Sequence, residues 1–229
     1  MIVTLGAYED KRGNVIIYNG EHRNSVKITF SGGNNTLIVD EHSQINNSMI
    51  LFDCNHGVCE IGNNKFVGNI RIGQDCKVRI NDKVTCTNSC IITTAEGSSV
   101  LIGEDCMLAS SVELRADDAH PIFNVRTGLR INLPRDIVVG EHVWLAARTT
   151  ILSGGMIGNG SILGYGSILK SRIPNNCIAV GIPAKVTKRN VAWERPHLSI
   201  TPPFYKPDKN SIPVTSKYWK RTAVKKLEN

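Results

Sequence analysis

The sequence has few aromatic residues and no long apolar run. Phe, Trp and Tyr make up 6% of the 229 residues, although 41% are hydrophobic, so aliphatic side chains must build most of the core. No stretch approaches the roughly 18 apolar residues that a membrane-spanning helix needs, and the N-terminus lacks the basic flank of a signal peptide. We therefore expect a cytoplasmic protein.

The seven cysteines include no C-x-x-C pair. An odd number without metal-site spacing argues against a disulfide framework and against a zinc-binding pattern. Free cysteine packs like a small apolar side chain, and thiols stay reduced in the cytosol. The cysteines are therefore predicted to be reduced core residues.

Acidic and basic residues nearly balance outside the C-terminal segment. Residues 1–184 contain 16 Lys and Arg against 17 Asp and Glu, whereas residues 185–229 contain 11 against 3. The C-terminal segment thus carries all of the net positive charge. Such a segment suits a phosphate ligand, an acidic polymer or peripheral contact with an anionic membrane face, and a solvated tail is the alternative. No nucleic-acid motif or stacking platform accompanies the charge, so no nucleic-acid partner is expected.

What the sequence does contain is a six-residue period. Every sixth residue from Ile72 to Leu114 and from Val139 to Leu169 is apolar at 13 of 14 positions, Glu96 being the exception, and a small residue often follows. Six residues per side are too few for a helix and its connections, but they suit a short strand and a corner. The period predicts an all-β chain wound into a parallel β-helix.

The two series are out of phase, which predicts an excursion between them. We expect irregular β-helix coils over residues 1–71, a regular hexapeptide β-helix over 72–185, and a loop projecting from it at about 117–135. Five of the nine prolines lie beyond residue 185, where no repeat continues. Residues 186–229 are therefore predicted to form an extended, Pro-rich, basic tail with a short basic helix at 216–228.

His120 breaks the repeat where the loop begins. The series of every sixth residue from Ile72 to Leu114 continues to position 120. The repeat predicts an apolar, inward-facing side chain at that position, but the residue is histidine. Histidine readily takes a proton near neutral pH, and the neighbouring Asp117 and Asp118 could orient the imidazole. A departure from a local rule is typical of a functional site, while a structural histidine at a loop hinge is the alternative.

Several motifs resemble the hexapeptide-repeat O-acetyltransferases, most closely the capsular polysaccharide and polysialic acid O-acetyltransferases. The resemblance is carried by Ala119-His120-Pro121, Val139-Gly140-Glu141-His142-Val143-Trp144-Leu145, Leu163-Gly164-Tyr165-Gly166-Ser167 and Gly181-Ile182-Pro183-Ala184-Lys185. It implies a left-handed coil of triangular section, assembled as a homotrimer. It also implies transfer of an acetyl group from acetyl-CoA to a hydroxyl by direct attack, with no metal and no enzyme nucleophile.

The resemblance assigns roles to particular residues. His120 would be the general base and Trp144 would assist catalysis, although an outward tryptophan that only packs is the alternative. Asp118 and Arg126 would contact the acceptor. The residues implied to bind acetyl-CoA are small corner residues for the pantetheine and basic residues for the phosphates: Ala147, Gly164, Lys170, Lys185, Lys188 and Arg189.

The acceptor is predicted to be a sugar in a capsular or surface polysaccharide, because long N-terminal coils and a basic tail exceed what a small acceptor needs. A small sugar or an antibiotic is the alternative, and a non-catalytic β-helix binding protein is a further one. A carbonic anhydrase of the same coil needs two histidines five residues apart. No two of the six histidines have that spacing, so that enzyme is rejected.

Overall fold

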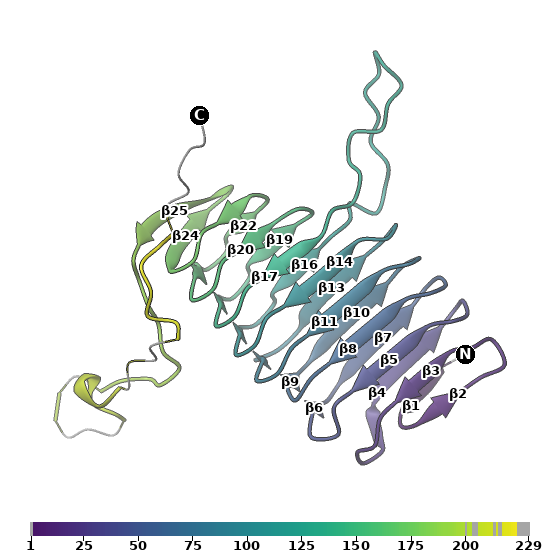
Figure 1. Cartoon of the computed structure of the whole chain (residues 1–229), viewed down its shortest axis with the longest axis horizontal. Coiled ribbons are helices and arrows are strands. Elements are labelled where there is room, and N and C mark those ends of the chain that lie inside the picture. The colour runs from purple at the N-terminus through teal and green to yellow at the C-terminus, as the bar shows by residue number, and fades with distance from the viewer. Residues whose placement is uncertain (1, 200, 203–205, 213, 215–216, 224–229) are drawn as a thin grey trace.

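The computed structural model describes residues 2–199, 201–202, 206–212, 214 and 217–223, and it forms a β-solenoid (Figure 1). Each turn of the chain adds one short strand to each of three sheets in the order A, B, C. Strands of successive turns pair in parallel, so the backbone hydrogen bonds run along the solenoid axis. The predicted all-β, left-handed parallel β-helix with a projecting loop and an extended tail is confirmed.

The strands alternate regularly among the three sheets. Sheet A contains β1 (Ile2–Leu5), β4 (Arg23–Phe30), β7 (Ser48–Phe52), β10 (Gly68–Ile72), β13 (Cys90–Thr94), β16 (Glu113–Arg115), β19 (Thr150–Leu152) and β22 (Ile168–Leu169). Sheet B contains β2 (Tyr8–Glu9), β3 (Val15–Ile17), β5 (Thr36–Val39), β8 (Val58–Ile61), β11 (Lys77–Ile80), β14 (Ser99–Ile102), β17 (Ile137–Val139), β20 (Met156–Ile157) and β23 (Arg172–Ile173). Sheet C contains β6 (Gln44–Ile45), β9 (Lys65–Phe66), β12 (Thr85–Cys86), β15 (Met107–Leu108), β18 (Trp144–Leu145), β21 (Ile162–Leu163), β24 (Cys177–Gly181) and β25 (Ala184–Arg189).

The length of a turn changes along the chain. Beyond the loop, Val139 pairs with Ile157, 18 residues on, as three hexads require. Before the loop, Val78 pairs with Val100, 22 residues on. The expectation of six residues per side is therefore wrong for the earlier turns, whose corners hold additional residues. Glu96, the exception in the apolar series, lies exposed at such a corner.

The early turns are more regular than expected. Among these early turns, antiparallel pairing is limited to β1 with β4 and β2 with β3, which close the N-terminal end. From β4 to β24 the strands pair in parallel without a register shift, and β25 closes the other end by pairing antiparallel with β24. The aromatic rings concentrate here, with Tyr8, Phe30 and Phe52 stacked at centroid distances of 5.9 and 5.0 Å.

The cysteines are free thiols, and six of the seven are buried. Burial raises the pKa of the Cys106 thiol to about 12, so this core thiol stays protonated and inert. A hydrogen bond from Cys90 lowers the pKa of Cys86 to about 7. Reduced core residues are what the sequence predicts.

The loop and the tail are the two segments outside the coil. The chain between β16 and β17 projects from the corner between sheets A and B (Figure 1). The tail follows β25 and has one 3-10 turn, Lys209–Ser211, among its described residues. The predicted basic helix at 216–228 is wrong for residues 217–223, which are not helical, and its remainder lies outside the described residues. None of the described helices is long and apolar enough to cross a membrane.

Candidate active site

His120 lies at the base of the loop, where the chain leaves the corner between sheets A and B. Its side chain is exposed, and neither ring nitrogen hydrogen-bonds to a described residue. The backbone turns sharply just before it, because Ala119 has a φ of 60° and His120 N donates to the carbonyl of Asp118 at 2.7 Å. The turn therefore presents the imidazole to solvent with both nitrogens available for chemistry.

The loop base is held by a buried carboxylate. Asp117 Oδ1 accepts hydrogen bonds from Ala119 N at 2.9 Å and from Arg71 Nη2 at 3.1 Å, and Arg71 also reaches Asp53 at 3.4 Å. Asp117 Oδ2 is buried and has no partner among the described residues. Asp117 thus ties the loop to a strand two turns away. The sequence led us to expect that Asp117 could orient the imidazole of His120. Instead, its carboxylate binds Ala119 N and Arg71.

A single amide closes the loop base from the other side. Asn132 Nδ2 donates to Asp118 Oδ2 at 3.0 Å and to the carbonyl of His120 at 2.8 Å. Its Oδ1 accepts from Ile122 N at 2.7 Å. The predicted acceptor contact Asp118 therefore lies beside His120 and is engaged by Asn132 rather than by the imidazole. Asn132 thus holds the outgoing and returning segments of the loop together next to His120.

Trp144 lies on a different face of the solenoid. It follows the corner between sheets B and C, and in β18 it pairs with Met107 and Ile162 on the outward row of sheet C. The ring is half-buried, and its Nε1–H has no hydrogen-bond partner among the described residues. Its nearest aromatic neighbour is Trp193 of the tail, with centroids 6.0 Å apart. The indole is therefore supported on one side and leaves a donor free.

One chain does not bring the two predicted catalytic residues together. In a triangular coil, the corner between sheets A and B is opposite sheet C. His120 lies where the loop leaves the corner between sheets A and B, and Trp144 lies on sheet C. The packed core separates the two residues. Figure 1 shows the loop extending away from the coil rather than folding back over it. A site that uses both residues needs a second copy of the chain.

The predicted cofactor residues divide among three places. Ala147 and Gly164 lie at the corner between sheets C and A in successive turns, where Gly166 N donates to the carbonyl of Ala147 at 3.0 Å. Lys185 pairs with Val180 at the end of sheet C nearest this corner. These residues lie on sheet C or at its corner with sheet A, and Trp144 lies on the same sheet. A Cβ on Gly164 would press against Val180 Cγ1 of the next turn, so a glycine lets the two turns pack closely here.

The remaining basic residues do not lie at the corner between sheets C and A. Lys170 follows β22 at the corner between sheets A and B, on the far side of the coil from β25. Lys188 pairs with Ile178 on β24, and Arg189 pairs with Cys177 near the corner between sheets B and C. Arg126 lies exposed at the loop tip. In one chain, these four residues do not form a single binding site.

The structure contains a second charged cluster that sequence reasoning missed. The His142 ring lies between the rings of Trp193 and Tyr218, with centroids 4.1 and 4.4 Å away. Its Nδ1 lies 2.6 Å from Asp105 Oδ2, and its Nε2 lies 2.9 Å from the carbonyl of Trp193. Both nitrogens face acceptors, so both contacts are hydrogen bonds only when the ring carries two protons.

Arg195 completes this tail latch, which we define as Asp105, His142, Trp193, Arg195 and Tyr218. Its Nε donates to Asp105 Oδ1 at 2.8 Å, and its Nη2 donates to the carbonyls of Asp105 and Cys106. Part of the basic charge of the tail is therefore used to dock the tail on its own coil. Sequence spacing carries no signal of the latch, because its contacting residues are about 50 to 90 positions apart.

The latch gives a stability prediction. Asp105→Asn should release the tail, because it weakens two charge-assisted hydrogen bonds of about 1.5–3 kcal/mol each. Trypsin should then cut the released tail markedly faster, after Lys217 and Lys220, and the melting temperature should fall. Asp75→Asn is the matched control, since Asp75 and Asp105 both have positive φ, at 55° and 59°, and asparagine tolerates that conformation. Equal proteolysis of the two variants would contradict the latch.

A left-handed β-helix with a projecting loop is the architecture of hexapeptide-repeat acyltransferases. No protein-family model matches the chain. Among curated proteins, the polysialic acid O-acetyltransferase of Neisseria meningitidis is 37% identical over 175 residues, which cover 75% of this chain and 81% of that protein. The polysialic acid O-acetyltransferase of Escherichia coli O1:K1 is 37% identical over 133 residues, and there the chain spans 43% of the relative's length.

Solved structures agree with these similarities. The polySia-specific acetyltransferase NeuO superposes with a TM-score of 0.76 at 35% identity, covering 80% of this chain and 85% of that one. The polysialic acid O-acetyltransferase OatWY superposes with a TM-score of 0.70 at 27% identity, covering 90% and 96%. The chain belongs to the hexapeptide-repeat O-acetyltransferases, in the branch that contains these capsular enzymes, and it is an acyltransferase.

Proposed function

We propose that the protein transfers an acetyl group from acetyl-CoA to a sugar hydroxyl of a capsular polysaccharide, in a site shared by two subunits of a homotrimer. The observation that carries this proposal is the placement of His120 and Trp144 on opposite sides of one coil. In a cyclic assembly, each subunit offers a different face to its two neighbours. The loop of one subunit then reaches sheet C of the next, and every site is complete.

The surface of the loop supports this assembly. Six large apolar side chains on it are between 51% and 98% exposed: Ile122, Phe123, Val125, Leu129, Ile131 and Leu133. A projecting segment with so much exposed apolar surface is stabilised by burial against another chain. Arg130 pairs with Glu96 through two hydrogen bonds of 2.6 and 3.0 Å, which fixes the direction in which the loop leaves. The loop is therefore prepared for docking before assembly.

His120 is the general base of the proposed reaction. Its imidazole takes the proton from the acceptor hydroxyl as the oxygen attacks the thioester carbonyl of acetyl-CoA. The C–O bond forms, the C–S bond breaks, and the proton held by His120 passes to the departing CoA thiolate. No covalent enzyme intermediate is needed. This agrees with the free imidazole nitrogens and with the rigid turn that holds the ring at the loop base.

Trp144 supplies the donor that the attack requires. Negative charge develops on the carbonyl oxygen, and a preorganised N–H in a partly dry site stabilises it. The Nε1–H of Trp144 is available, whereas the Nε1–H of Trp193 is occupied by the carbonyl of His142 at 2.9 Å. Acetyl-CoA lies along the corner between sheets C and A, with its pantetheine against Ala147 and Gly164. Lys185, and Lys170 of an adjacent subunit, contact its phosphates.

The acceptor class rests on the relatives, whose names state activity on polysialic acid. Asp118 beside His120 and Arg126 on the same loop are the proposed acceptor contacts. A cytoplasmic location is part of the proposal, because the seven free thiols suit a reducing compartment. Peripheral membrane contact through the tail would place the enzyme near a growing polymer.

The test is transfer activity with defined acceptors. Purified protein and acetyl-CoA are combined with polysialic acid, neutral capsular polymers, nucleotide sugars or acetyl-accepting antibiotics, and release of the CoA thiol is followed. We expect release with an anionic capsular polymer and a rise in melting temperature with acetyl-CoA alone. Release only with small sugars or antibiotics would overturn the acceptor assignment. A protein that neither binds acetyl-CoA nor releases thiol would overturn the function.

A further inference from the structure

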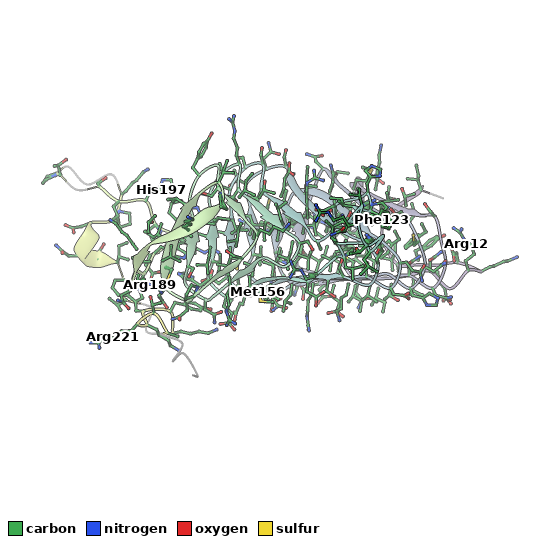
Figure 2. All side chains as sticks on the ribbon, turned by 90° about the horizontal axis from the view of Figure 1, so that it is seen from above. Arg12, Phe123, Met156, Arg189, His197 and Arg221 are labelled. Carbon is green, nitrogen blue, oxygen red and sulfur yellow. The ribbon has the colours of Figure 1, made fainter. Side chains whose placement is uncertain are left out.

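A basic pocket lies at the C-terminal end of the coil, between the last turns and the tail. Its volume is about 860 Å³, within the range of sites that enclose a drug-sized ligand. Among the described residues, four basic side chains and no carboxylate line it. They come from separate segments, which are β23, β25 and the tail: Arg172, Arg189, Lys217 and Lys220. Figure 2 shows Arg189 at this end, near Arg221, on the same edge of the coil as Met156.

The wall formed by the tail is fixed in place. Asn176 Nδ2 donates to the carbonyls of Val191 at 2.9 Å and Tyr218 at 2.6 Å. Asn175 Nδ2 donates to the carbonyl of Arg221 at 3.0 Å, and its Oδ1 accepts from Ala223 N at 2.8 Å. Lys220 is therefore presented by a backbone that is clamped to the last turn, and the pocket is formed before any ligand binds.

Three of the four basic groups are available to a ligand. Lys217 is committed to the coil, because its Nζ lies 2.8 Å from Glu141 and 3.4 Å from Glu104. Its hydrogen bond to Glu141 raises the pKa of Lys217 well above its usual value. Arg172, Arg189 and Lys220 are exposed and form no ion pair within the part of the chain that the structure describes. Such a group of unpaired cations attracts an anion with several charges.

The pocket is separate from the proposed catalytic surface. Ala147, Gly164 and Lys185 lie at the corner between sheets C and A, whereas Asn159 and Asn175 place the pocket at the corner between sheets B and C. Acetyl-CoA bound along the first corner leaves the second one free. Arg189 thereby changes from a predicted cofactor residue to a residue of this pocket.

We propose that this pocket is a secondary binding site for an anionic polysaccharide, the acceptor polymer itself, held through the carboxylates of its sugar acids by Arg172, Arg189 and Lys220. The inference rests on the proposed function. It adds a second site that binds the polymer at a distance from the hydroxyl that is acetylated. A polymer held at a second site has a raised effective concentration at the first. The enzyme should therefore prefer long acceptors over short ones.

The test separates binding from chemistry. Affinity for long polysialic acid, for a trisaccharide of the same sugar and for acetyl-CoA is measured for the wild type and for Arg172→Gln/Lys220→Gln. The matched control is Lys11→Gln/Lys27→Gln, which removes the same charge from exposed positions in the first turns. We expect the pocket variant to bind the long polymer at least about tenfold more weakly at low salt, with a smaller loss at high salt. The control should bind like the wild type.

Transfer rates give a second measurement beside polymer binding. The pocket variant should keep the wild-type kcat and KM on the trisaccharide and lose the preference for the long polymer. Unchanged polymer affinity, an equal loss in the control, or a loss of acetyl-CoA affinity with polymer binding intact would each overturn the inference. In the last case the pocket would hold the cofactor phosphates. If no variant or wild type transfers acetyl groups, polymer binding still decides whether the pocket exists as a site.

Discussion

Replacing His120 by alanine is expected to lower kcat by about 10²–10⁴-fold while leaving the affinity for acetyl-CoA nearly unchanged. The imidazole acts on the acceptor, not on the cofactor, so binding and chemistry should separate. The substitution should also leave the fold intact, because the side chain is exposed and contributes no hydrogen bond to the loop base. Affinity can be measured by calorimetry and kcat by release of the CoA thiol.

The loop-hinge alternative predicts the opposite pattern. If His120 only shaped the loop, alanine would reduce stability or assembly and leave the turnover of correctly folded protein intact. His42→Ala is a matched control, since His42 is an exposed histidine in an early turn, paired only with the neighbouring Glu41 at 3.5 Å. Full transfer activity in His120→Ala would mean that the general base lies elsewhere.

Trp144→Phe should lower kcat by about 10²–10³-fold at nearly unchanged stability, because phenylalanine keeps most of the ring and loses the N–H donor. Loss of one preorganised oxyanion donor has this magnitude. Trp144→Ala should be no more active and should also loosen the tail, since Trp193 packs against the indole. Melting temperature and kcat, measured on the same preparations, distinguish the two effects.

If Trp144 only packs, the two substitutions should affect stability before activity. Phenylalanine would then be close to wild type in activity, and alanine would lose stability first and activity only as a consequence. Trp219→Phe serves as the control, because Trp219 is an exposed indole of the tail whose N–H donates to Glu194 at 2.8 Å. A drop in kcat for the control equal to that for Trp144→Phe would show that the effect is not specific to the site.

The part of the fold that follows from local periodicity was predictable. Beyond the loop, the inward residues of β17, β18 and β19 are repeated after 18 positions in the next turn, as in Leu145 and Leu163, and the sequence shows the same residue type at every sixth place. Before the loop the turns are longer. Alternate residues of a strand point inward, so a step of six residues, which is an even number, still reaches many buried positions. The hexads thus predicted the right architecture there with the wrong turn length.

Contacts between distant segments were not predictable from spacing. Arg71 reaches Asp117 across 46 residues, and Arg195 reaches Thr85 across 110. Neither pair leaves a periodic trace, because each depends on how turns stack and on where the tail runs. His142 belongs to a motif that carried the family resemblance, yet its contacts with Trp193 and Tyr218 require the folded tail. The latch and the basic pocket both depend on this docking.

The candidate site was predictable as a set of residues but not as a place. His120 attracted notice because it breaks an apolar series, and Trp144 because it lies in a motif shared with acetyltransferases. Nothing in the sequence says that sheet C lies opposite the corner from which the loop departs. The same geometry separates Lys170 from Lys185, although both are basic residues of the last turns.

Mixed trimers test the shared active site most directly. His120→Ala and Trp144→Ala chains, each nearly inactive alone, are co-expressed in equal amounts with different tags, and assemblies that contain both are isolated. If each site takes its histidine from one subunit and its tryptophan from the next, random assembly leaves about a quarter of the sites intact. We predict about a third of wild-type activity in the isolated mixed trimers, since one site of three is then intact, about a quarter in the unselected mixture, and almost none in either parent. Activity of the mixture no higher than that of the parents would contradict a site shared between subunits.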